Sequence, residues 1–191
     1  FAGELGFRIK LLGVGRRTDK GVSLNVYPCM IPLSASIAHV DGVFNAVITE
    51  GDFVGHSMFV GRGAGEKPTA SAVVSDIADA ATGRGLPLLT VAQSDVEPLP
   101  IVPLSERVGE YYLRFEVCDK PGVVADISRI LGEENVSIAS MIQRGKTING
   151  AVPLIMTLHE SKEASVCEAL NRIERLESVL AKPCMLRIER L

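Results

Sequence analysis

The order of strand-like and helix-like patterns in residues 111–191 constrains the fold more tightly than any other feature of the sequence. Tyr111–Val117 alternates between apolar and polar residues, which is typical of a strand with one buried face. Helices are predicted at Pro121–Leu131 and Ser161–Leu176, each with one apolar stripe, and Ser161 is a plausible N-cap. Further strands are predicted at Val136–Gln143, Ala151–His159 and Met185–Arg190, with a loop around Gly145–Gly150.

These elements follow the order βαββαβ, which produces a four-stranded antiparallel sheet with both helices on one face. The fold class expected for this half is α+β, with a ferredoxin-like arrangement. The second face of the sheet needs a cover, and another copy of the same domain is the simplest one. We therefore expect the protein to be a homo-oligomer.

Residues 7–60 follow a different pattern, in which short alternating apolar runs are separated by turn-forming residues. This pattern predicts a β-rich sheet with tight connections, and Ser34–Val40 adds a short helical turn. Pro68–Thr82 is a predicted helix with Pro68 in its first turn, and Gly83 and Gly85 are expected to end it. The strands are expected at Phe7–Val14, Val22–Tyr27, Val43–Thr49 and His56–Val60.

Periodicity is lost over residues 83–110, which are rich in proline and resemble a linker with a short extended segment at Leu88–Val91. The predicted organisation is therefore a first domain over residues 1–94, a linker over residues 95–110 and a second domain over residues 111–191. Because the chain starts at Phe1 without Met or a signal sequence, and residues 1–14 look like the middle of a domain, we expect a fragment.

Composition and charge exclude several classes of function. The net charge of −3 is not that of a nucleic-acid binder, and Arg16–Arg17 is interpreted as a solvated strand end. No apolar run is long enough to cross a membrane. Scattered cysteines without a C-x-x-C pair favour reduced thiols in a cytoplasmic protein over zinc ligands or disulfides. These cysteines are Cys29, Cys118, Cys167 and Cys184.

The turn Asp119-Lys120-Pro121-Gly122 is the candidate binding site of the second half. Unpaired backbone amides and the helix dipole at such a helix start favour a carboxylate, and Asp119 suits an ammonium group. The pattern fits a zwitterionic amino acid. It is also common in helices that bind nothing, so the residues alone leave a purely structural role open.

The segment from Phe115 to Ala125, followed by Asn135-Val136-Ser137-Ile138, resembles the start of an ACT domain. In that family these two segments frame an effector pocket, often between two copies. The resemblance implies an effector-binding wall made by Asp119, Pro121, Gly122 and Val123. It implies a second wall made by Asn135, Ser137 and Ile138.

Gly61-Arg62-Gly63-Ala64-Gly65 follows a predicted strand and precedes a helix, but it does not match the G-x-G-x-x-G dinucleotide motif. Its pattern alone indicates a tight turn. Together with Lys10-Leu11-Leu12-Gly13, with Asp41–Val47, and with Pro68-Thr69-Ala70 and Asp76, it resembles homoserine dehydrogenase over residues 5–82.

Homoserine dehydrogenases reduce aspartate semialdehyde to homoserine with NADP or NAD, so the resemblance implies an oxidoreductase of threonine, methionine and isoleucine biosynthesis. It implies a cofactor contact at Gly65, with Gly63 and Ala64 beside it, and threonine as the ACT effector. The family's catalytic residues and main cofactor site are expected before Phe1, so this chain alone should be inactive. The alternative is a non-catalytic amino-acid-binding or dimerisation module.

Overall fold

The structure is a computed structural model that describes residues 1–84, 92–143 and 150–191. Contacts group these residues into two compact units. The first unit combines Phe1–Pro32 with Leu99–Leu191, and the second is Leu33–Pro98. The compact units therefore group the first hairpin with the C-terminal half of the chain.

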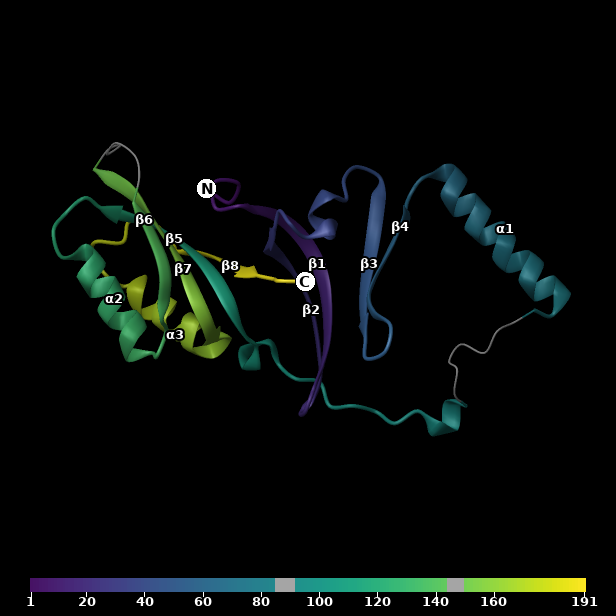
Figure 1. Cartoon of the computed structure of the whole chain (residues 1–191). Helices are drawn as coiled ribbons and strands as arrows, with labels where there is room; N and C mark the ends of the chain where they lie inside the picture. Colours follow the sequence, from purple (N-terminus) through teal and green to yellow (C-terminus); the bar gives the residue numbers. More distant parts are fainter. Residues whose placement is uncertain (85–91, 144–149) are drawn as a thin grey trace. The chain divides into compact units, whose positions relative to one another are not determined.

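The first unit is built on one six-stranded sheet in the order β1-β2-β8-β5-β7-β6 (Figure 1). Its strands are β1 (Phe7–Thr18), β2 (Gly21–Pro32), β5 (Val108–Cys118), β6 (Ile138–Gln143), β7 (Ala151–Lys162) and β8 (Cys184–Ile188). The pairs within β8-β5-β7-β6 are antiparallel, as predicted. β2 adds to β8 in parallel, with Cys29 opposite Arg187 and Met30 opposite Ile188.

Helices α2 (Val123–Glu133) and α3 (Glu163–Ile173) supply the apolar stripes that bury one face of β5-β7-β6 (Figure 1). Ile127, Leu131 and Ile173 are fully buried against Phe115 and Leu154 of the strands. Burying such aliphatic side chains contributes about 2 kcal/mol each. The predicted βαββαβ order and α+β class are confirmed.

Both helices of this half begin later than the sequence pattern predicts. Gly122, at φ 94°, is the residue before α2, so Pro121 lies in the preceding turn rather than in the helix. Ser161 is not the N-cap of α3, because β7 continues to Lys162 and pairs there with Val108. The tertiary pairing of an extended β7 overrides the local capping signal.

The other face of the sheet is covered in part by the chain itself. Met30, Tyr112, Ile155 and Ile188 form a buried cluster on it. The chain's first residues pack against this cluster through Ala2, Leu5 and Phe7. A second copy of the domain is therefore not needed to cover this part of the sheet.

Residues 100–102, within the predicted linker, pair with the start of β2. The Val22 amide donates to the Pro100 carbonyl at 2.8 Å, and the Val102 amide donates to the Val22 carbonyl at 2.9 Å. A Cβ on Gly21, where φ is 138°, would stand 2.1 Å from the Pro100 carbonyl oxygen, so only glycine allows this approach. Part of the linker is therefore an ordered component of the first unit.

The second unit contains the hairpin β3 (Phe44–Gly51) and β4 (Gly55–Arg62), the short 3-10 helices Ser36–His39 and Gln93–Asp95, and helix α1 (Glu66–Thr82). The helical turn, the hairpin and the long helix are all confirmed, and Gly83 ends α1 in the left-handed conformation at φ 68°. The apolar side chains Val73, Val74 and Ile77 of α1 are exposed. Gly85 and the extended segment predicted at Leu88–Val91 lie outside the described residues.

No helix within the described residues is long and apolar enough to cross a membrane.

Candidate functional site

The first wall of the predicted effector site lies at the N terminus of α2. Among the described residues no side chain caps this helix end, and a Cβ on Gly122 would meet nothing within 4 Å. Asp119 and Pro121 are exposed beside it, whereas Val123 is buried in the core. Within the described part of the chain, the first-turn amides of α2 have no capping side chain, which is the arrangement that accepts a carboxylate.

The second wall lies at the opposite end of α2, where Asn135 terminates the helix. Asn135 adopts φ 58°, and among the residues that the structure describes no other non-glycine residue has positive φ. Its amide donates to the Gly132 carbonyl at 3.0 Å, and the Val136 amide donates to the Leu131 carbonyl at 2.9 Å. These two bonds form a Schellman motif, so Asn135 has a structural role that local sequence chemistry explains.

The structure does not bring the two walls together within one chain. The eleven residues of α2 separate them, which corresponds to roughly 16 Å at 1.5 Å per residue. The strand pairing also places the two walls far apart. Cys118, which precedes the first wall, pairs with Ala151 at one end of β7, whereas Ile138 of the second wall pairs with Leu158 toward the other end. Ser137 is exposed, and its carbonyl accepts the His159 amide at 3.0 Å. A pocket that uses both walls must therefore combine two copies of the chain.

The glycine turn at residues 61–65 is exposed and joins β4 to α1. A Cβ on Gly63 would stand 1.7 Å from Nδ2 of the exposed Asn45 side chain on β3, so a larger residue there would require that side chain to move. Gly65 precedes α1 at φ 120°, a conformation that L side chains rarely adopt. Ala64 and Gly65 leave the backbone at the N terminus of α1 uncovered, which suits a backbone contact to a polar ligand.

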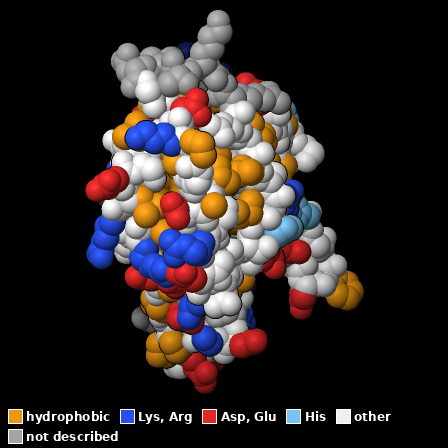
Figure 2. Space-filling view, turned by 90° about the vertical axis from the view of Figure 1, so that its left-hand side faces the viewer, with side chains coloured by type: hydrophobic (Ala, Val, Ile, Leu, Met, Phe, Trp, Pro, Cys, Tyr) orange, Lys and Arg blue, Asp and Glu red, His pale blue; other side chains and the backbone are white. Residues whose placement is uncertain are grey.

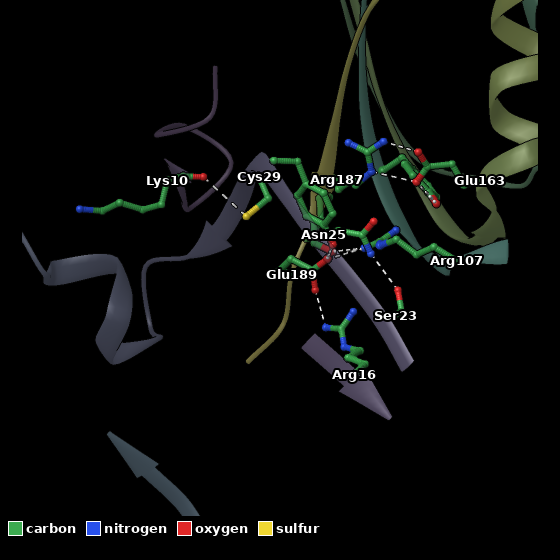
Figure 3. Close-up of polar contacts among 12 residues, drawn as sticks. Lys10, Arg16, Ser23, Asn25, Cys29, Arg107, Glu163, Arg187 and Glu189 are labelled. Atoms are coloured by element: carbon green, nitrogen blue, oxygen red, sulfur yellow. Dashed lines mark hydrogen bonds and ion pairs between the residues drawn. The ribbon is translucent and has the colours of Figure 1, made fainter. Parts of the chain in front are cut away.

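A buried carboxylate that the sequence patterns did not reveal joins β8 to the β1–β2 hairpin. Only 1% of the Glu189 side chain is exposed. Its Oε2 accepts a hydrogen bond from Arg16 at 2.5 Å, and its Oε1 accepts from Tyr27 Oη at 2.7 Å and from Arg107 Nη2 at 2.9 Å (Figure 3). Arg16 and Arg17 are exposed near the end of β1, as interpreted from the sequence, but the Arg16 head group also binds this buried carboxylate.

The surroundings of Glu189 decide its charge state. Burial by itself raises the pKa of a carboxyl group, but the hydrogen bonds from Arg16, Tyr27 and Arg107 outweigh it and lower the pKa of Glu189 below its ordinary value. Burial, together with the hydrogen bond to Glu189, raises the pKa of Tyr27 to about 12. Glu189 is therefore an anion and Tyr27 a neutral donor at neutral pH.

A second buried ion pair stands beside this group. Arg187 donates from Nε to Glu163 Oε2 at 2.8 Å and from Nη2 to the other oxygen of the same carboxylate (Figure 3). Its guanidinium also lies over the Tyr27 ring, 4.6 Å from the centroid. Alternation along β8 places Arg187 and Glu189 on one face, but their partners come from distant segments, so no local signal could identify them.

Charges on the face drawn in Figure 2 are mixed, with Lys and Arg side chains adjoining Asp and Glu side chains. On α2, Arg129 lies 3.0 Å from Glu133 and 3.6 Å from Asp126. Such exposed pairs contribute little to stability, because water and salt screen them. The drawn face has no single-sign field of the kind that attracts a polyanion.

Comparison with known proteins gives two family matches. Residues 1–78 match the model of the homoserine dehydrogenase family, and residues 111–177 match the model of the ACT domain. The chain is 42% identical to a homoserine dehydrogenase of Neisseria gonorrhoeae, over all of this chain and 45% of the relative. It is 38% identical to a homoserine dehydrogenase of Pseudomonas aeruginosa, over all of this chain and 46% of the relative.

Solved structures extend the comparison to the fold. A homoserine dehydrogenase from Thiobacillus denitrificans superposes with a TM-score of 0.87 at 40% identity, over 99% of this chain and 44% of that one. One from S. aureus superposes with a TM-score of 0.61 at 24% identity, which shows a shared fold. The chain spans about half the length of the relatives that it matches. Its first segment therefore matches the homoserine dehydrogenase family and its second the ACT domain, and the two together are similar to the C-terminal part of proteins named homoserine dehydrogenase.

Proposed function

We propose that the chain is the C-terminal part of a homoserine dehydrogenase that interconverts aspartate semialdehyde and homoserine, with an ACT domain that senses an amino acid. The observation that carries this proposal is the similarity to proteins named homoserine dehydrogenase, which runs through both the family segment and the ACT domain at 42% identity. In this proposal residues 1–94 belong to the catalytic half, residues 95–110 connect the halves, and residues 111–191 regulate them.

The nicotinamide cofactor, NADP or NAD, supplies or accepts the hydride of this reaction. We infer that Ala64 and Gly65 contact it through their backbone, since this turn is exposed and opens α1 without covering side chains. Gly63 is part of the same turn and lies beside the Asn45 side chain of β3. The role of these residues is to position the cofactor, and the chemistry belongs to groups elsewhere in the enzyme.

We infer that threonine is the effector and that it binds between two copies of the ACT domain. The amides at the N terminus of α2, with Gly122 uncovered, would receive the carboxylate, and Asp119 would receive the ammonium group. Asn135, Ser137 and Ile138 of the second copy would close the pocket. The position of β6 at the edge of the sheet supports such pairing, because an edge strand can add a neighbour.

The sensing proposal predicts that threonine raises the melting temperature of the chain in a saturable way. A ligand at one hundred times its Kd stabilises the folded state by about 2.7 kcal/mol, which differential scanning fluorimetry detects. Gly122→Asp should abolish the shift, because a carboxylate at the helix tip repels that of the ligand. Gly42→Asp is the matched control, since Gly42 also has a positive φ, the new side chain also enters open space, and its position in the second unit should leave the shift intact.

Absence of a shift at millimolar threonine in the unmutated chain would contradict sensing by threonine. Light scattering then separates the remaining possibilities, because a simple dimerisation module gives stable dimers whose mass does not respond to any amino acid. The enzymatic part is tested separately by assaying NAD(P)-dependent homoserine oxidation with the full-length protein. Lack of that activity would reject the dehydrogenase assignment whatever the ACT domain binds.

A further inference from the structure

The β1–β2 hairpin belongs to the first matched segment by sequence and to the ACT domain by its contacts. It lies within residues 1–78, which match the homoserine dehydrogenase family. Contacts nevertheless group Phe1–Pro32 with the C-terminal half, and the unit that carries the glycine turn begins at the next residue, Leu33. The hairpin is therefore joined to that unit directly through the backbone, whereas its packing is with the ACT domain.

A continuous series of polar contacts runs from the second wall of the proposed effector site to this hairpin, and its first part follows β7. The Ser137 carbonyl accepts the His159 amide at 3.0 Å, and β7 continues from there to Lys162. Glu163, the next residue, donates its amide to the Arg107 carbonyl at 2.8 Å. Only 5% of the Glu163 side chain is exposed, so a displacement of this end of β7 has to move the side chains packed around it.

The second part of the series crosses from β8 to the hairpin. Arg187 binds both oxygens of Glu163 (Figure 3), and its guanidinium lies 4.6 Å from the centroid of the Tyr27 ring. Tyr27 in turn donates to Glu189 at 2.7 Å, and Arg16 donates to the other oxygen of that carboxylate at 2.5 Å. Glu163 and Glu189 are both buried, so breaking either ion pair would leave a charge without compensation.

We propose that the β1–β2 hairpin transmits effector binding from the ACT domain to the dehydrogenase half, through the hydrogen bonds of Tyr27 and Arg16 to Glu189. This inference rests on the proposed function, because it requires an amino acid bound between two ACT domains. The ligand fixes the residues of the second wall, the end of β7 moves with them, and the paired charges carry the movement to the hairpin. Tyr27 and Arg16 are positioning residues, since neither contacts the effector or the reacting groups.

The test uses the full-length protein and two variants, each of which removes one hydrogen bond between the hairpin and Glu189. Tyr27→Phe and Arg16→Met should bind threonine with unchanged affinity, which scanning fluorimetry measures, because neither residue belongs to the effector pocket. At saturating threonine, the inhibition of homoserine oxidation should be weaker by roughly threefold in each variant, relative to its own activity without threonine. A residue that only stabilised the fold would not separate binding from inhibition in this way.

Matched controls make the same chemical changes outside this series of contacts. Tyr112→Phe alters a buried tyrosine on the other face of the sheet, and Arg17→Met removes the exposed charge next to Arg16. Both controls should be inhibited like the unmutated protein. Circular dichroism establishes that each variant is folded. If Tyr27→Phe does not fold, Arg16→Met decides the question alone, since the Arg16 side chain is 44% exposed.

Three results would overturn the proposal and leave threonine sensing intact. The first is that threonine binds to the unmutated protein without inhibiting it. The second is that Arg16→Met is inhibited as strongly as the unmutated protein, and the third is that the controls lose inhibition to the same degree as the hairpin variants. Absence of threonine binding to the unmutated protein would instead reject the sensing function, and this inference with it, so the two failures are distinct.

Discussion

Glu189 illustrates at the scale of one residue how a buried charge can join segments that are far apart in the sequence. Its carboxylate is reached by Arg16 and Tyr27 from the hairpin and by Arg107 from the approach to β5. Removing one partner of a buried pair costs about 3 kcal/mol or more, because the remaining charges stay buried without compensation. The same side chain therefore fixes the position of the hairpin against β8 and depends on that position for its own partners.

Glu189→Gln should lower the free energy of unfolding by about 3 kcal/mol at neutral pH. Because the folded-state pKa of Glu189 is below its unfolded value, its contribution is complete above the unfolded value of about 4.3 and is lost as the pH falls through the folded pKa. Urea unfolding of both proteins across the acid range measures this, and the two free energies should converge in acid. A difference independent of pH would show that the ionised form of Glu189 is not what stabilises the fold.

The sequence predicted the helices and strands better than any other feature of the structure. The apolar stripes of α2 and α3 and the alternation of β5 are set by residues such as Ile127, Ile173 and Leu113, all of them fully buried. The ends of these elements were harder to predict. β7 continues through Ser161 because Val108 and Gly109 of β5 pair with it there, and this pairing is not visible in the local sequence. The separation of Gly122 from Asn135 within one chain became clear from the eleven residues of α2 in the structure.

Asn135 allows the structural and binding roles of one position to be separated. Asn135→Ala should lower the free energy of unfolding by about 1 kcal/mol, because alanine is disfavoured in the left-handed conformation. Asn135→Gly should keep or slightly raise stability, since glycine is the preferred residue in this motif. Equilibrium urea unfolding measures both, with Ser137→Ala as the exposed control. Equal losses in the two Asn135 variants would mean that the side chain, not the backbone conformation, stabilises the end of α2.

At the scale of the whole molecule, the main feature absent from the sequence patterns is the addition of β2 to the edge of the ACT sheet. Local alternation predicted both β2 and β8, but it contained nothing to indicate that Met30 would lie opposite Ile188. The family comparison likewise treats residues 1–78 and 111–177 as separate matches. The sequence therefore predicted the parts of the candidate sites and the class of fold, whereas the contacts around Glu189 required the folded chain.

Hydrogen exchange should reveal this arrangement as a difference in protection between strands. Amides of β2 near Cys29 and Ile31 belong to a six-stranded sheet and should exchange as slowly as those of β5, through global unfolding. Amides of β3 and β4 belong to a two-stranded sheet and should exchange faster, through local opening. Mass spectrometry of peptides resolves the two groups. Protection of β2 no greater than that of β3 would show that β2 is not part of the cooperative core.

The pairing of β2 with β8 also has a consequence during synthesis on the ribosome. The two strands are joined through Met30 and Ile188, so the inner edge of the first hairpin is made before its neighbour, and β5, β6 and β7 are made between them. Throughout that interval the edge exposes unpaired amides and carbonyls, which can pair with any other extended chain. Slow translation through the intervening codons prolongs this exposure, and chaperones that shield nascent strands would act at this stage.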